Sequence, residues 1–346
     1  MTGLEGLRYP LVQAPMAGGP STPALTTAVA ETGALGFLAA GYRKLDEVRA
    51  DINAVRKQTK KPFGLNLLIA PKEAVDAVAL ERYRRELEAE AERHGVELGE
   101  PRYDDDDRQA KLELAIEEQV PIVSFAFGCP TREEIDLLHR HGRAVWVTVT
   151  EPHEAQAAEE AGVDLLVAQG VEAGGHRGSW AEADGVGELG LLPLLRAIVR
   201  TTELPLVAAG GIMDGAAVAA VLAAGARAAQ LGTAFLLCPE AGTSIPHREA
   251  IRTARSTALT RAFTGRRARG LVNRFMRDHS AAAPAAYPHV HFMTAPLRAA
   301  ARASGDPEPL NPWAGEGFAH CREVGAPKLV GALAAESEAA KRALCP

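Results

Sequence analysis

A glycine-rich segment that ends in a histidine is the part of this sequence best suited to chemistry. It follows the apolar run at residues 163–168 and extends from Gln169 to His176, with Gly174 and Gly175 directly before the histidine. Glycine lets the backbone approach a flat or anionic ligand closely, because it carries no Cβ atom. A histidine can move a proton near neutral pH, since its unperturbed pKa is about 6.5. The segment therefore indicates a proton-transfer site, and an ordinary turn with a surface histidine is the alternative.

Two further glycine loops come later in the chain, each directly after an apolar run. Together they contain Ala209, Gly210, Gly211, Gln230, Leu231, Gly232 and Thr233. Asp214 is placed to cap the helix that follows the first of these loops. Backbone N–H groups in a glycine loop, with a helix N-terminus behind them, form a ready anion site. The loops therefore predict a phosphorylated ligand, and tight turns without a ligand are the alternative.

Eight apolar runs separated by helical segments would position these loops. They lie at residues 11–14, 34–39, 62–68, 120–125, 144–149, 163–168, 204–209 and 226–231. Most of them are continuous rather than alternating, which is typical of strands buried on both faces of a parallel sheet. Eight such units predict an α/β fold, a (β/α)8 TIM barrel, in which phosphate is usually held after strands seven and eight. A doubly wound open sheet is less favoured, because no G-x-G-x-x-G follows the first strand.

Two stretches do not fit the barrel pattern. A long charged helix is expected from Glu73 to His94, and a strand is expected at residues 257–263. We predict a barrel over residues 1–241, a smaller second α+β domain over residues 242–302 that covers the barrel mouth, and a C-terminal helical tail over residues 303–346 that packs back on the barrel.

Composition excludes several classes of partner. The net charge of -6 argues against nucleic acid and anionic membranes, which would require a basic face. No apolar run reaches the length of about 20 residues that spans a bilayer, and the N-terminus does not resemble a signal peptide. The 4 cysteines are widely spaced, so neither a disulfide framework nor a metal site is expected. The chain is expected in the cytoplasm, with a small molecule as its partner.

Two side-chain amides would face the same end of the barrel. Asn66 lies at the end of the third apolar run, and Gln169 lies at the end of the sixth. Each amide offers a donor and an acceptor, which suits the polar edge of a flavin ring. For Asn66, a role in a cap or a turn is an equal alternative.

Five loops, taken in order, resemble those of the nitronate monooxygenase family, formerly called 2-nitropropane dioxygenases. They lie at residues 15–18, 64–67, 168–176, 209–211 and 230–233, so the resemblance covers about residues 10 to 240. The tail at residues 311–317 resembles the family more loosely.

The resemblance implies an FMN-dependent barrel enzyme with His176 as its catalytic residue. The residues that it implies for FMN binding are Pro15, Met16, Ala17, Asn66, Gln169, Gly174, Gly175, Ala209, Gly210, Gly211, Gln230, Leu231, Gly232 and Thr233. A neutral imidazole would remove the acidic α-proton of a nitroalkane, and the flavin would accept an electron from the resulting nitronate. The expected reaction oxidises alkyl nitronates with dioxygen to a carbonyl compound and nitrite. Use of neutral nitroalkanes is left open.

Two other functions stay open at this point. NAD(P)H-dependent flavin reductases of the same superfamily, which reduce quinones or enoyl-ACP, share much of this loop pattern. A non-catalytic FMN-binding protein is disfavoured, because His176 would have no reaction to perform there.

Overall fold

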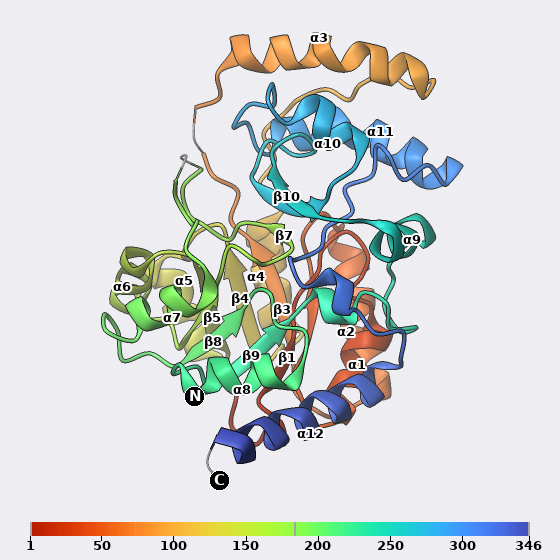
Figure 1. Cartoon of the computed structure of the whole chain (residues 1–346). Coiled ribbons are helices and arrows are strands. Elements are labelled where there is room, and N and C mark those ends of the chain that lie inside the picture. The colour runs from red at the N-terminus through yellow and green to blue at the C-terminus, as the bar shows by residue number, and fades with distance from the viewer. Residues whose placement is uncertain (1, 73, 183–184, 345–346) are drawn as a thin grey trace.

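Eight parallel strands form a nearly closed barrel (Figure 1). The structure is a computed structural model that describes residues 2–72, 74–182 and 185–344. The barrel strands are β1 (Leu11–Gln13), β2 (Gly36–Ala39), β3 (Phe63–Leu68), β4 (Ile122–Ala126), β5 (Ala144–Val149), β6 (Leu165–Gln169), β8 (Leu206–Ala209) and β9 (Ala228–Leu231). Their order is β1-β9-β8-β6-β5-β4-β3-β2, and a bridge between Val12 and Leu35 joins the two end strands. The prediction of a (β/α)8 barrel is confirmed.

Helices cover the outside of the barrel. They are α1 (Pro23–Glu31), α2 (Leu45–Gln58), α4 (Arg108–Glu117), α5 (Arg132–Arg140), α6 (Pro152–Ala161), α7 (Leu191–Ile198) and α8 (Gly215–Ala223). The last position is filled by α12 (Ala326–Leu344), which packs against α1 and α8. Its apolar residues Leu329, Val330 and Leu333 are buried in the outer core, so burial of this face holds the tail against the barrel.

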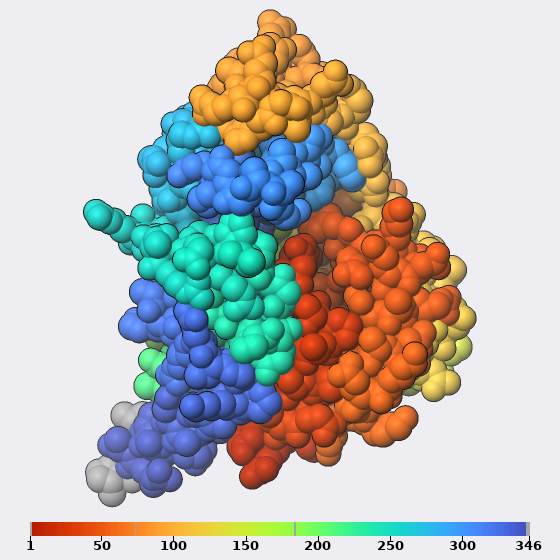
Figure 2. Space-filling model, turned by 90° about the vertical axis from the view of Figure 1, so that its right-hand side faces the viewer, coloured from red at the N-terminus to blue at the C-terminus, as the bar shows by residue number. Residues whose placement is uncertain are grey.

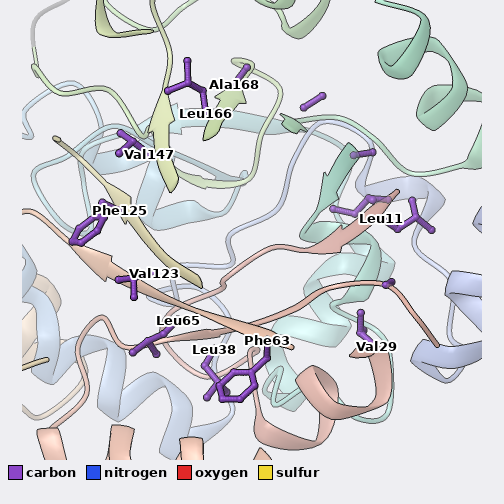
Figure 3. Packing of buried hydrophobic residues seen from close by; sticks show 14 of the residues in the cluster. Leu11, Val29, Leu38, Phe63, Leu65, Val123, Phe125, Val147, Leu166 and Ala168 are labelled. Atoms are coloured by element: carbon purple, nitrogen blue, oxygen red, sulfur yellow. The ribbon is translucent and has the colours of Figure 1, made fainter. Parts of the chain in front are cut away.

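Side chains alternate between two cores along each barrel strand, because successive side chains of a strand point to opposite faces. On β5, Val145 and Val147 belong to the core between strands and helices, part of which Figure 3 shows. Trp146, between them, belongs to the core inside the barrel. The same alternation places Asn66 and Gln169 on the inner face. Gln169 is the last residue of β6, and Asn66 lies two residues before the end of β3.

A second layer covers the carboxyl ends of the barrel strands (Figure 1). Its antiparallel sheet has the order β10 (Thr257–Thr260), β11 (Ala268–Leu271) and β7 (Gly175–His176). Its helices are α3 (Ala77–Arg93), α9 (Ile245–Thr253), α10 (Arg274–His279) and α11 (His289–Ser304). The strand expected at residues 257–263 is present as β10, which covers residues 257–260. The glycine-rich segment from Gln169 to His176, called the histidine loop below, supplies β7.

Helix α3 belongs to this second layer, although it precedes β4 in the chain. Its residues Tyr83 and Leu87 share a buried cluster with Phe263, Phe275 and Met293. In Figure 2 the orange α3 lies over the blue α11, which in turn lies above the barrel. The sequence pattern did not indicate this association. Glu73, where the charged helix was expected to begin, lies outside the described residues, and the proposed boundaries at residues 241 and 302 stay predictions.

Candidate active site

A cavity of about 620 Å³ lies at the carboxyl ends of the barrel strands, below the second layer. This volume is in the range of about 300–1,000 Å³ typical of small-molecule sites. Every residue that the sequence predicted for the site lines it: Pro15, Met16, Ala17, Asn66, Gln169, Gly174, Gly175, His176, Ala209, Gly210, Gly211, Gln230, Leu231, Gly232 and Thr233. They meet because the carboxyl ends of all strands in a barrel point to the same side.

The three amides on the inner face differ in the partners that they have. Asn66 Nδ2 donates to the hydroxyl of Ser124 at 3.0 Å. Gln169 is engaged at both ends: its Nε2 donates to the carbonyl of His176 at 3.1 Å, and its Oε1 accepts from the backbone N–H of Gly178 at 2.8 Å. Gln230 lines the cavity, and its side chain has no hydrogen-bond partner within the described ranges. Gln169 therefore positions the histidine loop, while the amide of Gln230 and the Oδ1 of Asn66 are without a partner in the described ranges.

Arg177 holds the histidine loop in place through hydrogen bonds to backbone carbonyls. Its side chain is fully buried and donates to the carbonyls of Gln169 (2.8 Å), Gly170 (2.7 Å) and Gly187 (2.8 Å). Burial lowers the pKa of this guanidinium to about 10, so it stays charged at neutral pH. Arg177 was not among the residues predicted for the site, and its position directly after the histidine is the one signal for it in the sequence. Such a clamp fixes where the imidazole of His176 can lie.

His176 is surrounded by aromatic rings on the cavity wall. The ring centroids of Trp313, Phe127 and Tyr287 lie 5.5, 5.7 and 5.9 Å from the imidazole centroid. Burial, with a smaller contribution from Arg266 and Arg298, lowers the pKa of His176 to about 3. The imidazole is therefore neutral at physiological pH, which is the form that can accept a proton.

Thr264 is hydrogen-bonded to this imidazole and helps to orient it. His176 Nε2 lies 2.9 Å from the Thr264 hydroxyl oxygen, and that hydroxyl donates to the carbonyl of Arg266 at 3.2 Å. With the hydroxyl proton directed at that carbonyl, Nε2 is the donor of the pair, and Nδ1 is the ring nitrogen left to accept a proton. Nδ1 has no hydrogen-bond partner within the part of the chain that the structure describes. No sequence pattern pointed to Thr264, because 88 residues separate it from His176.

Tyr42 and Phe127 line the cavity in unusual backbone conformations. Their φ angles are 64° and 74°, in the left-handed region that non-glycine residues rarely adopt. The Tyr42 ring stacks on His291 with centroids 4.3 Å apart, and its hydroxyl lies 3.2 Å from that of Tyr287. Strained residues of this kind cluster at ligand sites, where the surrounding structure holds them in place. Nothing in the sequence pattern marked these two residues.

The two glycine loops present backbone N–H groups that have no acceptor. The N–H groups of Gly210, Gly211 and Gly232 donate no hydrogen bond to any residue in the described ranges. Gly210 and Gly211 have φ of 123° and 68°, so glycine is required at both positions. Asp214 Oδ1 accepts from the Ala217 N–H at 2.8 Å, which confirms the predicted cap of α8. This cradle of unused donors at the seventh and eighth strands fits a phosphate group.

The C-terminal tail also lines the cavity, through residues between 311 and 317. The Gly315 N–H donates to the Thr233 hydroxyl at 2.9 Å, and a Cβ atom on Gly174 would lie only 2.5 Å from the Gly315 nitrogen. The tail and the histidine loop are therefore in direct contact. In the described ranges, no group of three or more His, Cys, Asp or Glu side chains could hold a metal ion, and no helix has the length and apolar character needed to cross a membrane.

Comparisons with known proteins identify the family of this chain. Residues 1–336 match the family model described as nitronate monooxygenase. The chain is 42% identical to a nitronate monooxygenase from Pseudomonas aeruginosa, over 97% of this chain and 98% of that protein. It is 39% identical to a nitronate monooxygenase from Paraburkholderia phytofirmans, over 96% of this chain and 93% of that protein.

Two solved structures superpose on nearly the whole chain. A nitroalkane oxidase from Streptomyces ansochromogenes superposes with a TM-score of 0.95 at 49% identity, covering 99% of this chain and 100% of that one. FabK from Thermotoga maritima superposes with a TM-score of 0.78 at 27% identity, covering 99% of this chain and 96% of that one. The chain therefore belongs to the nitronate monooxygenase family and is an oxidoreductase.

Proposed function

We propose that this protein oxidises alkyl nitronates with FMN as its cofactor and dioxygen as the oxidant, giving a carbonyl compound and nitrite. Neutral nitroalkanes enter the same reaction once they have lost their α-proton. The observation that carries the proposal is the neutral imidazole of His176 on the wall of a cavity whose other end has a cradle of unused N–H donors. Membership of the nitronate monooxygenase family supports it.

The residues of the cavity fit FMN. The N–H groups of Gly211 and Gly232 would hold the phosphate, and the amide of Gln230 would bind a polar edge of the ring system. Met16 and Ala17 would contact a face of the rings. When bound, FMN supplies the electron acceptor, and the protein supplies binding and orientation.

The chain's own residues account for the proton transfer. His176 Nδ1 removes the α-proton of a neutral nitroalkane, while Thr264 holds Nε2 in its protonated form. Arg177 and Gln169 fix the loop that carries the imidazole. Phe127, Tyr287 and Trp313 surround the imidazole and keep water away from it.

Anaerobic mixing of the FMN-loaded protein with an alkyl nitronate, and separately with NADH, tests this function. Loss of the oxidised flavin absorbance with the nitronate alone is the expected result. Reduction by NADH alone would support a flavin reductase instead, the class suggested by the likeness to FabK. Reduction by neither would indicate a protein that binds FMN without turnover.

We also propose a cytoplasmic location for the protein. Cys129, Cys238 and Cys321 are free cysteines, which supports a reducing environment. Immunoblotting of separated cell fractions would test it, and recovery in a secreted or membrane fraction would contradict it.

A further inference from the structure

The described residues that line the cavity include positively charged side chains but no negatively charged ones. Among the described residues that line it, arginine and histidine are present but aspartate and glutamate are not. The arginines are Arg298 and Arg302, both on α11. The chain as a whole has a net charge of -6, so the cavity is a positively charged region within an acidic protein. Such a lining favours an anionic ligand.

Arg298 is buried without a compensating charge. Only 6% of its surface is exposed, and no carboxylate in the described ranges lies within ion-pair distance of its guanidinium. Its Nη2 donates to the carbonyl of His291 at 2.6 Å, whereas its Nε has no hydrogen-bond partner. Burial lowers the pKa of Arg298 to about 10, which leaves it protonated at neutral pH. A buried cation of this kind is costly unless an anion neutralises it.

Arg177, the buried arginine that holds the histidine loop, differs in this respect. Both Nη atoms of Arg177, and its Nε, donate to carbonyl oxygens of the chain. That arginine is a structural clamp with its donors in use. Arg298 lines the cavity and keeps donor capacity that the described chain does not use.

Arg298 belongs to the wall that includes His176. It is hydrogen-bonded to His291, which stacks on Tyr42, and Tyr42 in turn contacts Tyr287 beside the His176 imidazole. The glycine cradle for phosphate belongs to the barrel loops, whereas Arg298 comes from α11 in the second layer. Arg298 is therefore on the side of the cavity where the proton is removed.

We propose that Arg298 is a substrate-binding residue that holds an oxyanion of the substrate, at a subsite separate from the FMN phosphate. The oxyanion is either the nitronate group itself or a carboxylate elsewhere in the substrate molecule. This proposal rests on the proposed function. In either case the guanidinium supplies charge-assisted hydrogen bonds to a flat, two-oxygen group, the geometry that arginine suits best.

Titration of the FMN-loaded protein with nitrate, followed by the flavin absorbance, tests the subsite without turnover. Nitrate is a flat oxyanion that cannot be oxidised here, so its binding is independent of whether nitronates are substrates. The Kd for nitrate should rise about ten- to a hundredfold in Arg298→Met, as expected for loss of hydrogen bonds to a charged group. Arg298→Lys should recover part of the affinity. Arg277→Met, which removes an exposed arginine outside the cavity, is the matched control.

Steady-state kinetics distinguish the two sources of the oxyanion. If the KM of Arg298→Met rises equally for ethyl nitronate and for a nitronate that carries a carboxylate, Arg298 holds the nitronate group. If it rises only for the carboxylated substrate, Arg298 holds the carboxylate. An unchanged nitrate Kd in Arg298→Met overturns the proposal, and so does loss of FMN from that variant with an unchanged melting temperature, because Arg298 would then serve the cofactor.

Discussion

The imidazole of His176 and the hydroxyl of Thr264 lie 2.9 Å apart, although they come from two different parts of the second-layer sheet. His176 is in β7, which extends from the barrel loop after β6, and Thr264 is in the connection between β10 and β11. Pairing of β7 with β11, in which His176 faces Ala268, brings them together. The second layer therefore contributes to the orientation of this imidazole and does more than cover the cavity.

Replacing Thr264 tests whether the tautomer matters. Thr264→Val keeps the shape of the side chain but removes the acceptor of the Nε2–H bond. We expect kcat with a neutral nitroalkane to fall about tenfold, because part of the imidazole population would carry its proton on Nδ1. Thr264→Ser, which keeps the hydroxyl, should retain most activity. Equal activity of the Val and Ser variants would contradict this role.

Removing the imidazole should affect activity with neutral nitroalkanes and with pre-ionised nitronates differently. His176→Ala should lose activity with neutral nitroalkanes by about 10² to 10⁴, the usual contribution of a general base. Pre-ionised nitronates should be oxidised much as before, because their proton is already gone. Rates with both forms, measured on protein of equal flavin content, check the prediction. A similar loss on both forms would mean that His176 binds substrate instead.

The lowered pKa of His176 predicts how stability depends on pH. The imidazole titrates at about 3 in the folded chain, and at about 6.5 when unfolded. Between these values the unfolded state binds the extra proton, so the free energy of unfolding decreases as pH falls below about 6.5. His176→Gln should therefore reduce the loss of melting temperature between pH 7 and pH 4. An unchanged slope would show that the folded imidazole titrates normally.

His247 should also decrease the free energy of unfolding as the pH falls. Burial lowers its pKa to about 4, so it also disfavours the folded state in acid. The double variant His176→Gln/His247→Gln should show a smaller pH dependence of melting temperature than either single variant. Additive slopes would indicate that the two imidazoles titrate independently.

Gly211→Val should weaken FMN binding more than it weakens the fold. A Cβ atom there would lie 3.1 Å from Glu172 Cβ, and the φ of 68° disfavours any side chain. Gly142→Val is the control for backbone strain, since Gly142 has φ of 71° with open space around it and lies outside the cavity. Fluorescence titration gives the FMN affinity, and thermal melting gives the stability. Tight FMN binding by Gly211→Val would contradict this phosphate site.

Gly232 should tolerate a small side chain better than Gly211 does. A Cβ atom there would be 3.5 Å from Ala14 Cβ and 3.6 Å from Met16 Sδ, which are ordinary contact distances. Gly232→Ala should thus lower FMN affinity less than Gly211→Ala does. The Kd values for FMN in the two variants test this order. A larger loss of affinity in Gly232→Ala than in Gly211→Ala would contradict it.

The sequence by itself determined the barrel and the end of it at which the candidate site residues meet. Continuous apolar runs report burial on both faces, and parallel strands bring their carboxyl ends together. The alternation of side chains along a strand then directs Asn66, Gln169 and Gln230 inward. For this reason, the predicted loops all line one cavity.

Only the tertiary structure decided what the second layer contributes. Tyr83 of α3 donates to the carbonyl of Ala262 at 2.7 Å across 179 residues, and Thr264 reaches His176 across 88. Periodicity reveals that one face of a helix or strand is buried, but it does not reveal the partner that buries it. The uncompensated charge of Arg298 was hidden for the same reason, because an ion pair or its absence depends on contacts between elements far apart in the chain.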